Sequence, residues 1–121
     1  MKIQKLNREE ITQALKTISG WILEPDEAFM HKTTSGWILE PDEAFMHKQW
    51  QFDTFKTAMD FITEVADIAE RQNHHPEFLS VYRKMRVRLS THDASGLTQK
   101  DFDLATAIDS LIASQFSHRI Q

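Results

Sequence analysis

Apolar residues recur at helical spacing between residues 53 and 71. The positions that share the predicted inner face are Phe55, Met59, Ile62, Ala66 and Ala69, flanked by Phe61, Val65 and Ile68. Such a stripe is typical of a helix that packs against a core. Asp53 is expected to cap this helix. The helix should end near Asn73, because His75 precedes Pro76 and is pushed toward extended geometry.

Two further helices are predicted near the ends of the chain. Residues 8 to 17 follow Asn7, a suitable N-cap, and carry a thin apolar stripe of Ile11, Leu15 and Ile18. Thr98 is expected to cap a last helix that runs to about Phe116, and Asp101 has the spacing of a capping box. The predicted inner positions of that helix are Phe102, Ala105, Ile108 (or Leu104), Leu111, Ile112 and Gln115.

Residues 79 to 89 alternate between apolar and polar, which is typical of a strand covered on one face. The residues predicted to face the core are Leu79, Val81, Met85, Val87 and Leu89. Arg83 interrupts the apolar set, so a tight turn near Tyr82 to Lys84 could divide the segment into a hairpin. Residues 45 to 52 also alternate, but neither set is cleanly apolar, which suggests a strand contacted on both sides.

A fourteen-residue segment occurs twice: residues 19–32 and 35–48 are identical. The period is too short and the copies too few for a solenoid, so we interpret the repeat as a tandem duplication. Each copy predicts strand, turn and strand, with Pro25 or Pro41 in the turn. We favour the second copy as the hairpin, because it runs directly into the following helix. Alternatively, each copy supplies one strand and residues 24 to 43 bulge between them, or the extra copy pairs at a sheet edge or with another chain.

Composition narrows the class of protein. A chain of 121 residues predicts a single domain, 1–121. There is no cysteine, which excludes disulfides and thiolate chemistry. Eighteen acidic residues against fourteen basic ones give a net charge of −4, which argues against nucleic acid or an anionic membrane as a partner. No signal peptide or apolar membrane span is visible, so a cytoplasmic location is expected.

Three histidines form the candidate site. His74 and His75 stand before Pro76 at the predicted helix exit, and His92 follows the predicted strand. Imidazoles titrate near neutral pH and can act as acid and base. Glu70, one helical turn before His74, could orient that ring. A metal site, with Asp93 as a further ligand, is not expected, because adjacent histidines in an extended segment point to opposite faces.

This constellation resembles the signature of the pterin-4a-carbinolamine dehydratases. The matching residues are Glu70-x-x-x-His74-His75-Pro76, Tyr82, His92 and Asp101. The surrounding sequence also resembles that of the family. It has Gly-Trp before a hairpin, Leu-Ser-Thr-His-Asp at the strand exit, and Gly-Leu-Thr-x-x-Asp at the start of the last helix. With one copy of the repeat removed, the resemblance covers nearly the whole chain.

The resemblance implies an α+β fold: a four-stranded antiparallel sheet with helices packed on one face. The expected order is a β-β-α-β-β-α core after an N-terminal helix, with the duplicate of the first hairpin segment inserted. The implied activity is dehydration of 4a-hydroxytetrahydropterin to the quinonoid dihydropterin in tetrahydropterin recycling, without metal or organic cofactor. Assembly as a homodimer or homotetramer is also implied.

The resemblance also implies the roles of individual residues. His74 and His92 match the catalytic histidines, with His75 and Glu70 assisting. Substrate binding is expected of His74, His75, Pro76, the loop of Thr91, His92, Asp93 and Ala94, and the tryptophan of the Gly-Trp pair, which falls on Trp37 rather than Trp21. Asp101 is expected to support the structure.

Two alternatives to an active dehydratase remain at this point. The chain could be a binding or dimerisation module, since animal members of the family also act as dimerisation cofactors for a homeodomain transcription factor. It could also be an inactive variant that retains the fold, because the duplicated block contains Trp37.

Overall fold

The computed structural model describes residues 4–15, 21–22 and 36–121. Its helices and strands are, in chain order, α1 (Arg8–Leu15), β1 (Trp21–Ile22), β2 (Trp37–Leu39), β3 (Met46–Gln51), α2 (Phe55–Gln72), β4 (Glu77–Val81), β5 (Lys84–Leu89), the short 3-10 helix η2 (His92–Ala94), α3 (Gln99–Leu111) and the π-helical turn η3 (Ile112–Phe116). None of the helices in these ranges has the length and hydropathy needed to cross a bilayer.

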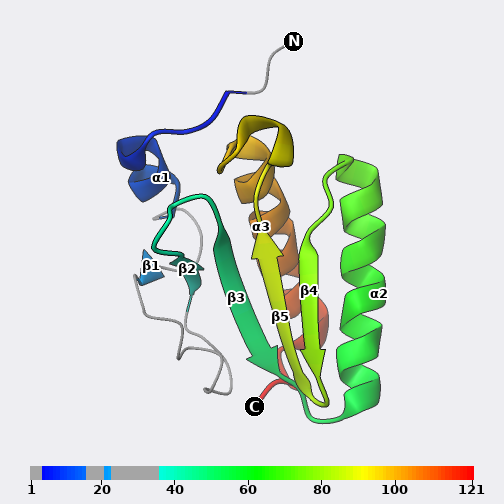
Figure 1. Ribbon diagram of the computed structural model, residues 1–121. Coiled ribbons are helices and arrows are strands. Elements are labelled where there is room, and N and C mark those ends of the chain that lie inside the picture. The colour runs from blue at the N-terminus through cyan, green and yellow to red at the C-terminus, as the bar shows by residue number, and fades with distance from the viewer. Residues whose placement is uncertain (1–3, 16–20, 23–35) are drawn as a thin grey trace.

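The sheet has the order β1-β2-β3-β5-β4, and β2, β3, β5 and β4 are antiparallel neighbours. Helices α2 and α3 pack on one face of it (Figure 1). The core lies between these layers, where Trp50 of β3 contacts Phe61 of α2 with ring centroids 5.0 Å apart. The expected α+β fold with a four-stranded antiparallel sheet is confirmed.

The second copy of the repeat forms the hairpin of β2 and β3, as predicted. The amide of Glu40 donates to the carbonyl of Phe45 at 2.9 Å, which closes the turn between the strands. Trp21 and Ile22 of the first copy form β1, which lies parallel to β2 in the register Trp21 to Trp37. The described part of the first copy therefore lies at the sheet edge, and its remaining residues lie outside the described ranges.

Helix α2 ends as predicted but begins differently. The N-cap is Thr54, not Asp53: the hydroxyl of Thr54 accepts from the amide of Thr57 at 3.0 Å. The C-cap is Asn73, whose positive φ of 52° ends the helix where the sequence predicts. The buried stripe is Ala58, Phe61, Val65 and Ala69, whereas Phe55 and Ala66 are exposed. The buried face of α2 is therefore rotated about the helix axis relative to the predicted one, because the sheet covers the face centred on Phe61 and Val65.

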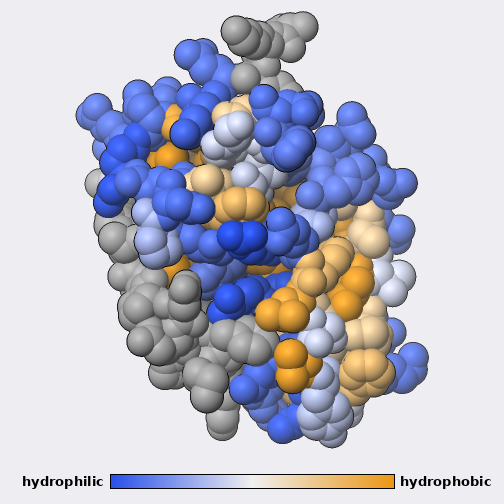
Figure 2. Space-filling model, viewed as in Figure 1, coloured by the Kyte–Doolittle hydropathy of each residue, from blue (hydrophilic) through white to orange (hydrophobic). Residues whose placement is uncertain are grey.

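The predicted inner face is right for β5 and wrong for β4. Met85, Val87 and Leu89 are fully buried, but Leu79 and Val81 are 46% and 48% exposed. A two-residue turn pairs Val81 with Lys84, so odd positions in β4 share a face with even positions in β5. Continuous alternation across the turn is therefore broken. The open face of the sheet is the one that α2 and α3 do not cover. Figure 2 shows apolar side chains gathered on the β4 side of this face.

The remaining expectations are mostly confirmed. All six residues of β3 are buried, in agreement with a strand contacted on both sides. Asn7 caps α1, because its Oδ1 accepts from the amide of Glu10 at 2.8 Å. Thr98 and Asp101 form the predicted capping box of α3. Gln115, expected on the inner side, is exposed, because the chain after Leu111 winds as the π-helical turn η3 and Phe116 is buried instead.

Candidate active site

The exit of α2 places two adjacent histidines on different sides of the chain. The amide of His74 donates to the carbonyl of Ala69 at 3.0 Å, so the first histidine still belongs to the helix end. The His74 side chain is 9% exposed, whereas that of His75 is 60% exposed. The two rings therefore meet different surroundings, as expected for neighbours in a non-helical segment.

The ring of His74 is held by a buried carboxylate from α3. Its Nε2 lies 2.6 Å from Oδ1 of Asp101, which is fully buried. The other carboxylate oxygen of Asp101 accepts from the hydroxyl of Thr91 at 2.7 Å and from the amide of Thr98 at 2.9 Å. Asp101 thus joins the capping box to the histidine, and each of its oxygens has a partner.

This arrangement selects one tautomer of His74. An ionised carboxylate only accepts hydrogen bonds, so Nε2 of the ring carries the proton that faces Asp101. Nδ1 is then the nitrogen that can take up or deliver a proton. A buried carboxylate behind a histidine is the arrangement that orients an acid–base imidazole in many active sites. Asp101 is expected from the sequence only to support the structure, and the structure adds its contact with the ring of His74.

Glu70 pairs with a different histidine from the one predicted. Its Oε2 lies 2.5 Å from Nε2 of His75, and both side chains are largely exposed. Helical spacing favoured His74, but the left-handed Asn73 ends the helix before that residue. His74 is thereby turned toward α3 and His75 back toward Glu70.

His92 completes the group of histidines at two adjoining hollows. It is exposed, at the start of η2, where the hydrogen bonds between Thr91 and Gly96 close the loop. One hollow, of about 390 Å³, is lined by Ala44, Phe45, His75, Glu77, Arg88, Ser90, His92 and Ser95. The other, of about 300 Å³, is lined by Asn73, His74, His75, Ser90, Thr91, His92, Asp93 and Lys100. His75, Ser90 and His92 belong to both, so the three histidines line two adjoining hollows, which together are the cleft of the candidate site.

Three of the expected substrate-binding residues do not line this cleft. Pro76 and Ala94 are partly buried beside it. Trp37 is fully buried in the core: its Nε1 lies 3.2 Å from both carboxylate oxygens of Asp109 in α3, and its ring packs edge-on against Trp50. The position of Trp37 does not support the role in substrate binding expected from the resemblance.

The structure also adds residues that sequence reasoning missed. Phe45 comes from the hairpin of the second copy, and Glu77, Arg88 and Ser90 come from β4 and the end of β5. Two of these residues could have been found by their position next to the predicted site. Ser90 directly precedes the Thr-His-Asp loop, and Glu77 directly follows the His-His-Pro run. The contribution of Phe45 depends on the fold of the hairpin and has no local signal.

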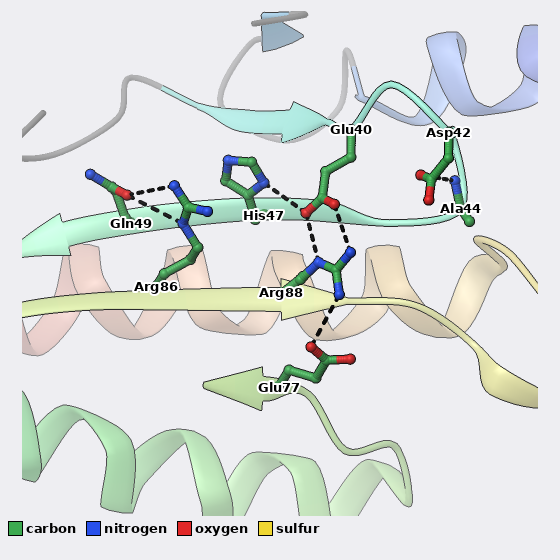
Figure 3. A network of polar contacts seen from close by, with 8 residues as sticks. All are labelled: Glu40, Asp42, Ala44, His47, Gln49, Glu77, Arg86 and Arg88. Atoms are coloured by element: carbon green, nitrogen blue, oxygen red, sulfur yellow. Dashed lines mark hydrogen bonds and ion pairs between the residues drawn. The ribbon is translucent and has the colours of Figure 1, made fainter. Parts of the chain in front are cut away.

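A charged network adjoins the cleft on the open face of the sheet (Figure 3). Both carboxylate oxygens of Glu40 accept from the guanidinium of Arg88 at 2.8 Å, and Oε2 of Glu40 also lies 2.9 Å from Nδ1 of His47. Burial opposes ionisation of Glu40, but the hydrogen bonds from Arg88 and His47 outweigh it and lower its pKa. Burial lowers the pKa of His47 despite the hydrogen bond to Glu40, and Glu40 raises the pKa of Arg88.

Comparison with known proteins finds one family along most of the chain. The family model of pterin 4 alpha carbinolamine dehydratase matches residues 4–111. A relative from Sinorhizobium fredii, named a putative pterin-4-alpha-carbinolamine dehydratase, is 39% identical over the full length of both chains. A relative of the same name from Rhizobium meliloti is 49% identical over 90% of this chain and 89% of its own. A crystal structure titled transcriptional coactivator/pterin dehydratase, from Brucella melitensis, superposes with a TM-score of 0.72 at 25% identity and covers 89% of this chain and 98% of its own.

Proposed function

Because the chain belongs to the pterin 4 alpha carbinolamine dehydratase family of hydro-lyases, we propose that it dehydrates a 4a-hydroxytetrahydropterin to the quinonoid dihydropterin. The observation that carries this proposal is the convergence of His74, His75 and His92 on one cleft, with His74 held by the buried Asp101. This step would return the pterin cofactor of aromatic amino-acid hydroxylases to the recycling pathway.

The reaction needs one proton delivered and one removed. The C4a–O bond breaks as the hydroxyl group takes up a proton and leaves as water. The adjacent ring nitrogen loses its proton, and its electron pair forms the new C=N bond. We assign these two transfers to His74 and His92, which border the cleft from different elements. Each positioned acid or base contributes roughly 10²- to 10⁴-fold to the rate.

The other residues of the cleft hold the substrate in this scheme. His75 is exposed in both hollows and is oriented by Glu70, so it can donate or accept a hydrogen bond to the pterin. The loop Thr91 to Ala94 offers backbone groups beside His92, and Pro76 stiffens the segment that carries the two adjacent histidines. No step in this scheme requires a metal or an organic cofactor.

We further propose that the chain assembles as a homodimer or homotetramer. The support is the outer strand β4, all of whose residues are exposed, including Phe78 and Leu79. Exposed edge strands pair readily with another chain. Sedimentation of the purified protein would reveal a monomer if this part of the proposal is wrong.

The function is tested by following conversion of a freshly generated 4a-hydroxytetrahydropterin to the quinonoid dihydropterin in the presence and absence of the protein. We expect clear acceleration over the spontaneous reaction, in proportion to protein concentration. Dehydration no faster than without protein would contradict the proposed activity.

A further inference from the structure

Arg88 stands at the centre of a row of side chains that crosses the open face of the sheet. Strand register places Arg88 of β5 opposite His47 of β3 and opposite Glu77 of β4. Its Nε and Nη2 donate to Glu40, while Nη1 donates to Oε1 of Glu77 at 3.2 Å (Figure 3). The guanidinium also lies 3.5 Å from the centre of the Phe45 ring. The ion pair and the aromatic ring therefore fix Arg88 from two sides.

Glu77 takes part in the histidine cleft as well as in this row. It lines the same hollow as His75 and His92, and it also lines a second hollow of about 440 Å³ on the open sheet face. Its side chain is 62% exposed. One residue separates Glu77 from His75, so in an extended segment both side chains emerge on the same side. Glu77 is thus a carboxylate at the wall of the cleft.

The N–H donors of Arg88 are unevenly shared between Glu40 and Glu77. Glu40 takes two of the guanidinium's donors in a fork, the strongest geometry for such a pair. Glu77 receives the remaining Nη1 on one oxygen only. Because a carboxylate offers about four lone-pair sites, most of the accepting capacity of Glu77 is open to a ligand. Two carboxylates and one guanidinium also leave this group of three with an excess negative charge.

We propose that Glu77 is a specificity-determining residue that recognises the 2-amino and N3–H edge of the pterin, with Arg88 as its positioning residue. This inference rests on the proposed function for its substrate class. The 2-amino-4-oxo pyrimidine ring presents two adjacent N–H donors, and a carboxylate accepts both in a fork. Glu77 would hold the pyrimidine end of the bicycle while the histidines act at C4a.

The alternative is a purely structural role, in which Glu77 only forms a surface ion pair with Arg88. Such pairs contribute about 0 to 1 kcal/mol to folding. Glu77→Gln should therefore fold normally under either interpretation, which makes it a suitable probe.

The experiment compares binding of two unreactive pteridines by fluorescence or calorimetric titration. Pterin has the 2-amino group, whereas lumazine has a 2-oxo group in its place and thus an acceptor where pterin has a donor. We expect the wild-type protein to bind pterin at least tenfold more tightly than lumazine. In Glu77→Gln this ratio should fall to about one, and KM for the carbinolamine should rise about tenfold with little change in kcat, because the contact is made equally in ground and transition states.

Two further variants separate positioning from folding. Arg88→Lys keeps one positive charge but cannot hold Glu40 and Glu77 in a planar fork, so we expect it to lose most of the pterin preference as well. Glu64→Gln, on the far surface of α2, is the matched control and should keep the wild-type ratio. If Arg88→Lys lowered the melting temperature but kept the ratio, its role would be structural only and the positioning claim would be wrong.

The outcomes for Glu77 are also distinct from those for the proposed function. An unchanged ratio of pterin to lumazine affinity in Glu77→Gln would overturn this assignment and leave the dehydratase activity intact. A wild-type protein that bound neither pteridine and did not accelerate dehydration would overturn both.

Discussion

Nε2 of His74 lies 2.6 Å from Oδ1 of Asp101, and this contact joins the exit of α2 to the first turn of α3. The two residues are 27 positions apart in the chain. The pair explains how a histidine at a helix end becomes a fixed imidazole: its ring is buried, and the carboxylate that holds it is itself held by Thr91 and Thr98.

Replacing Asp101 with Asn should slow catalysis. An amide can present either an acceptor or a donor to Nε2, so His74 loses its single tautomer, and we expect kcat to fall by roughly 10²-fold. The variant should also lose about 1 to 3 kcal/mol of stability, because partners in a buried network are left unsatisfied. Steady-state kinetics and urea unfolding measure the two effects.

A control is needed because Asp101 also caps α3. Asn7→Ala removes the cap of α1, far from the histidines in sequence, and should cost about 1 kcal/mol with kcat unchanged. A wild-type kcat in Asp101→Asn would show that the contact with His74 has no catalytic role.

Replacing Trp37 with Phe tests where this residue acts. The structure places its indole in the core with a hydrogen bond to Asp109, so we expect a loss of about 1 to 3 kcal/mol in unfolding free energy and no change in KM. A rise in KM without loss of stability would instead support the substrate-binding role that the family resemblance implies.

The pH dependence of stability should report on His47. Burial holds its pKa below the ordinary 6.5, and its buried Nε2 has no hydrogen-bond partner within the described ranges. As pH falls below about 6.5, the unfolded state takes up the proton first. The contribution of His47 is therefore fully present above that pH and is lost as pH falls toward the folded-state pKa.

The expected slope can be measured by urea unfolding at several pH values. His47→Gln should show a shallower decline of unfolding free energy below pH 6.5 than the wild-type protein. The difference should be at most about 1.4 kcal/mol per pH unit. The exposed His118, changed to Gln, serves as the control and should follow the wild-type curve. Identical slopes for all three proteins would rule out the assigned role of His47.

Deleting residues 19 to 34 should leave fold and activity intact. The four antiparallel strands and both long helices come from residues after 36, and β1 adds only two residues at the edge of the sheet. Shortening the segment before β2 lowers the entropy cost of closing it by about 0.6 kcal/mol for each halving of its length. This gain should offset the loss of the edge pairing. Equal rates with and without the segment are expected. A much faster deletion variant would mean that the duplicate obstructs the cleft.

Local chemistry made part of this fold predictable. The end of α2 at Asn73 follows from the His-His-Pro run, and the capping box at Thr98 and Asp101 follows from spacing alone. The burial of β4 was not predictable by alternation, because the two-residue turn after Val81 exchanges the faces of odd and even positions. A register change of one residue is enough to reverse every side chain.

The candidate site, like the fold, could be predicted only in part from the sequence. The three histidines stand out in the sequence because their residue type and spacing suit acid–base chemistry. Their partners do not, because they depend on tertiary contacts: Asp101 reaches His74 from α3, and Glu40 reaches Arg88 from the end of β2. Glu70 had suitable spacing for His74, yet the left-handed residue at the helix end redirects it to His75.

The dehydration rates of His74→Ala and His92→Ala test the central claim most directly. Both rings border the cleft, and we assign one proton transfer of the same step to each. Each variant should lose roughly 10²- to 10⁴-fold in kcat. The double variant should be little slower than the slower single one, because groups that act as a unit are not additive. Wild-type rates in both single variants would contradict the account.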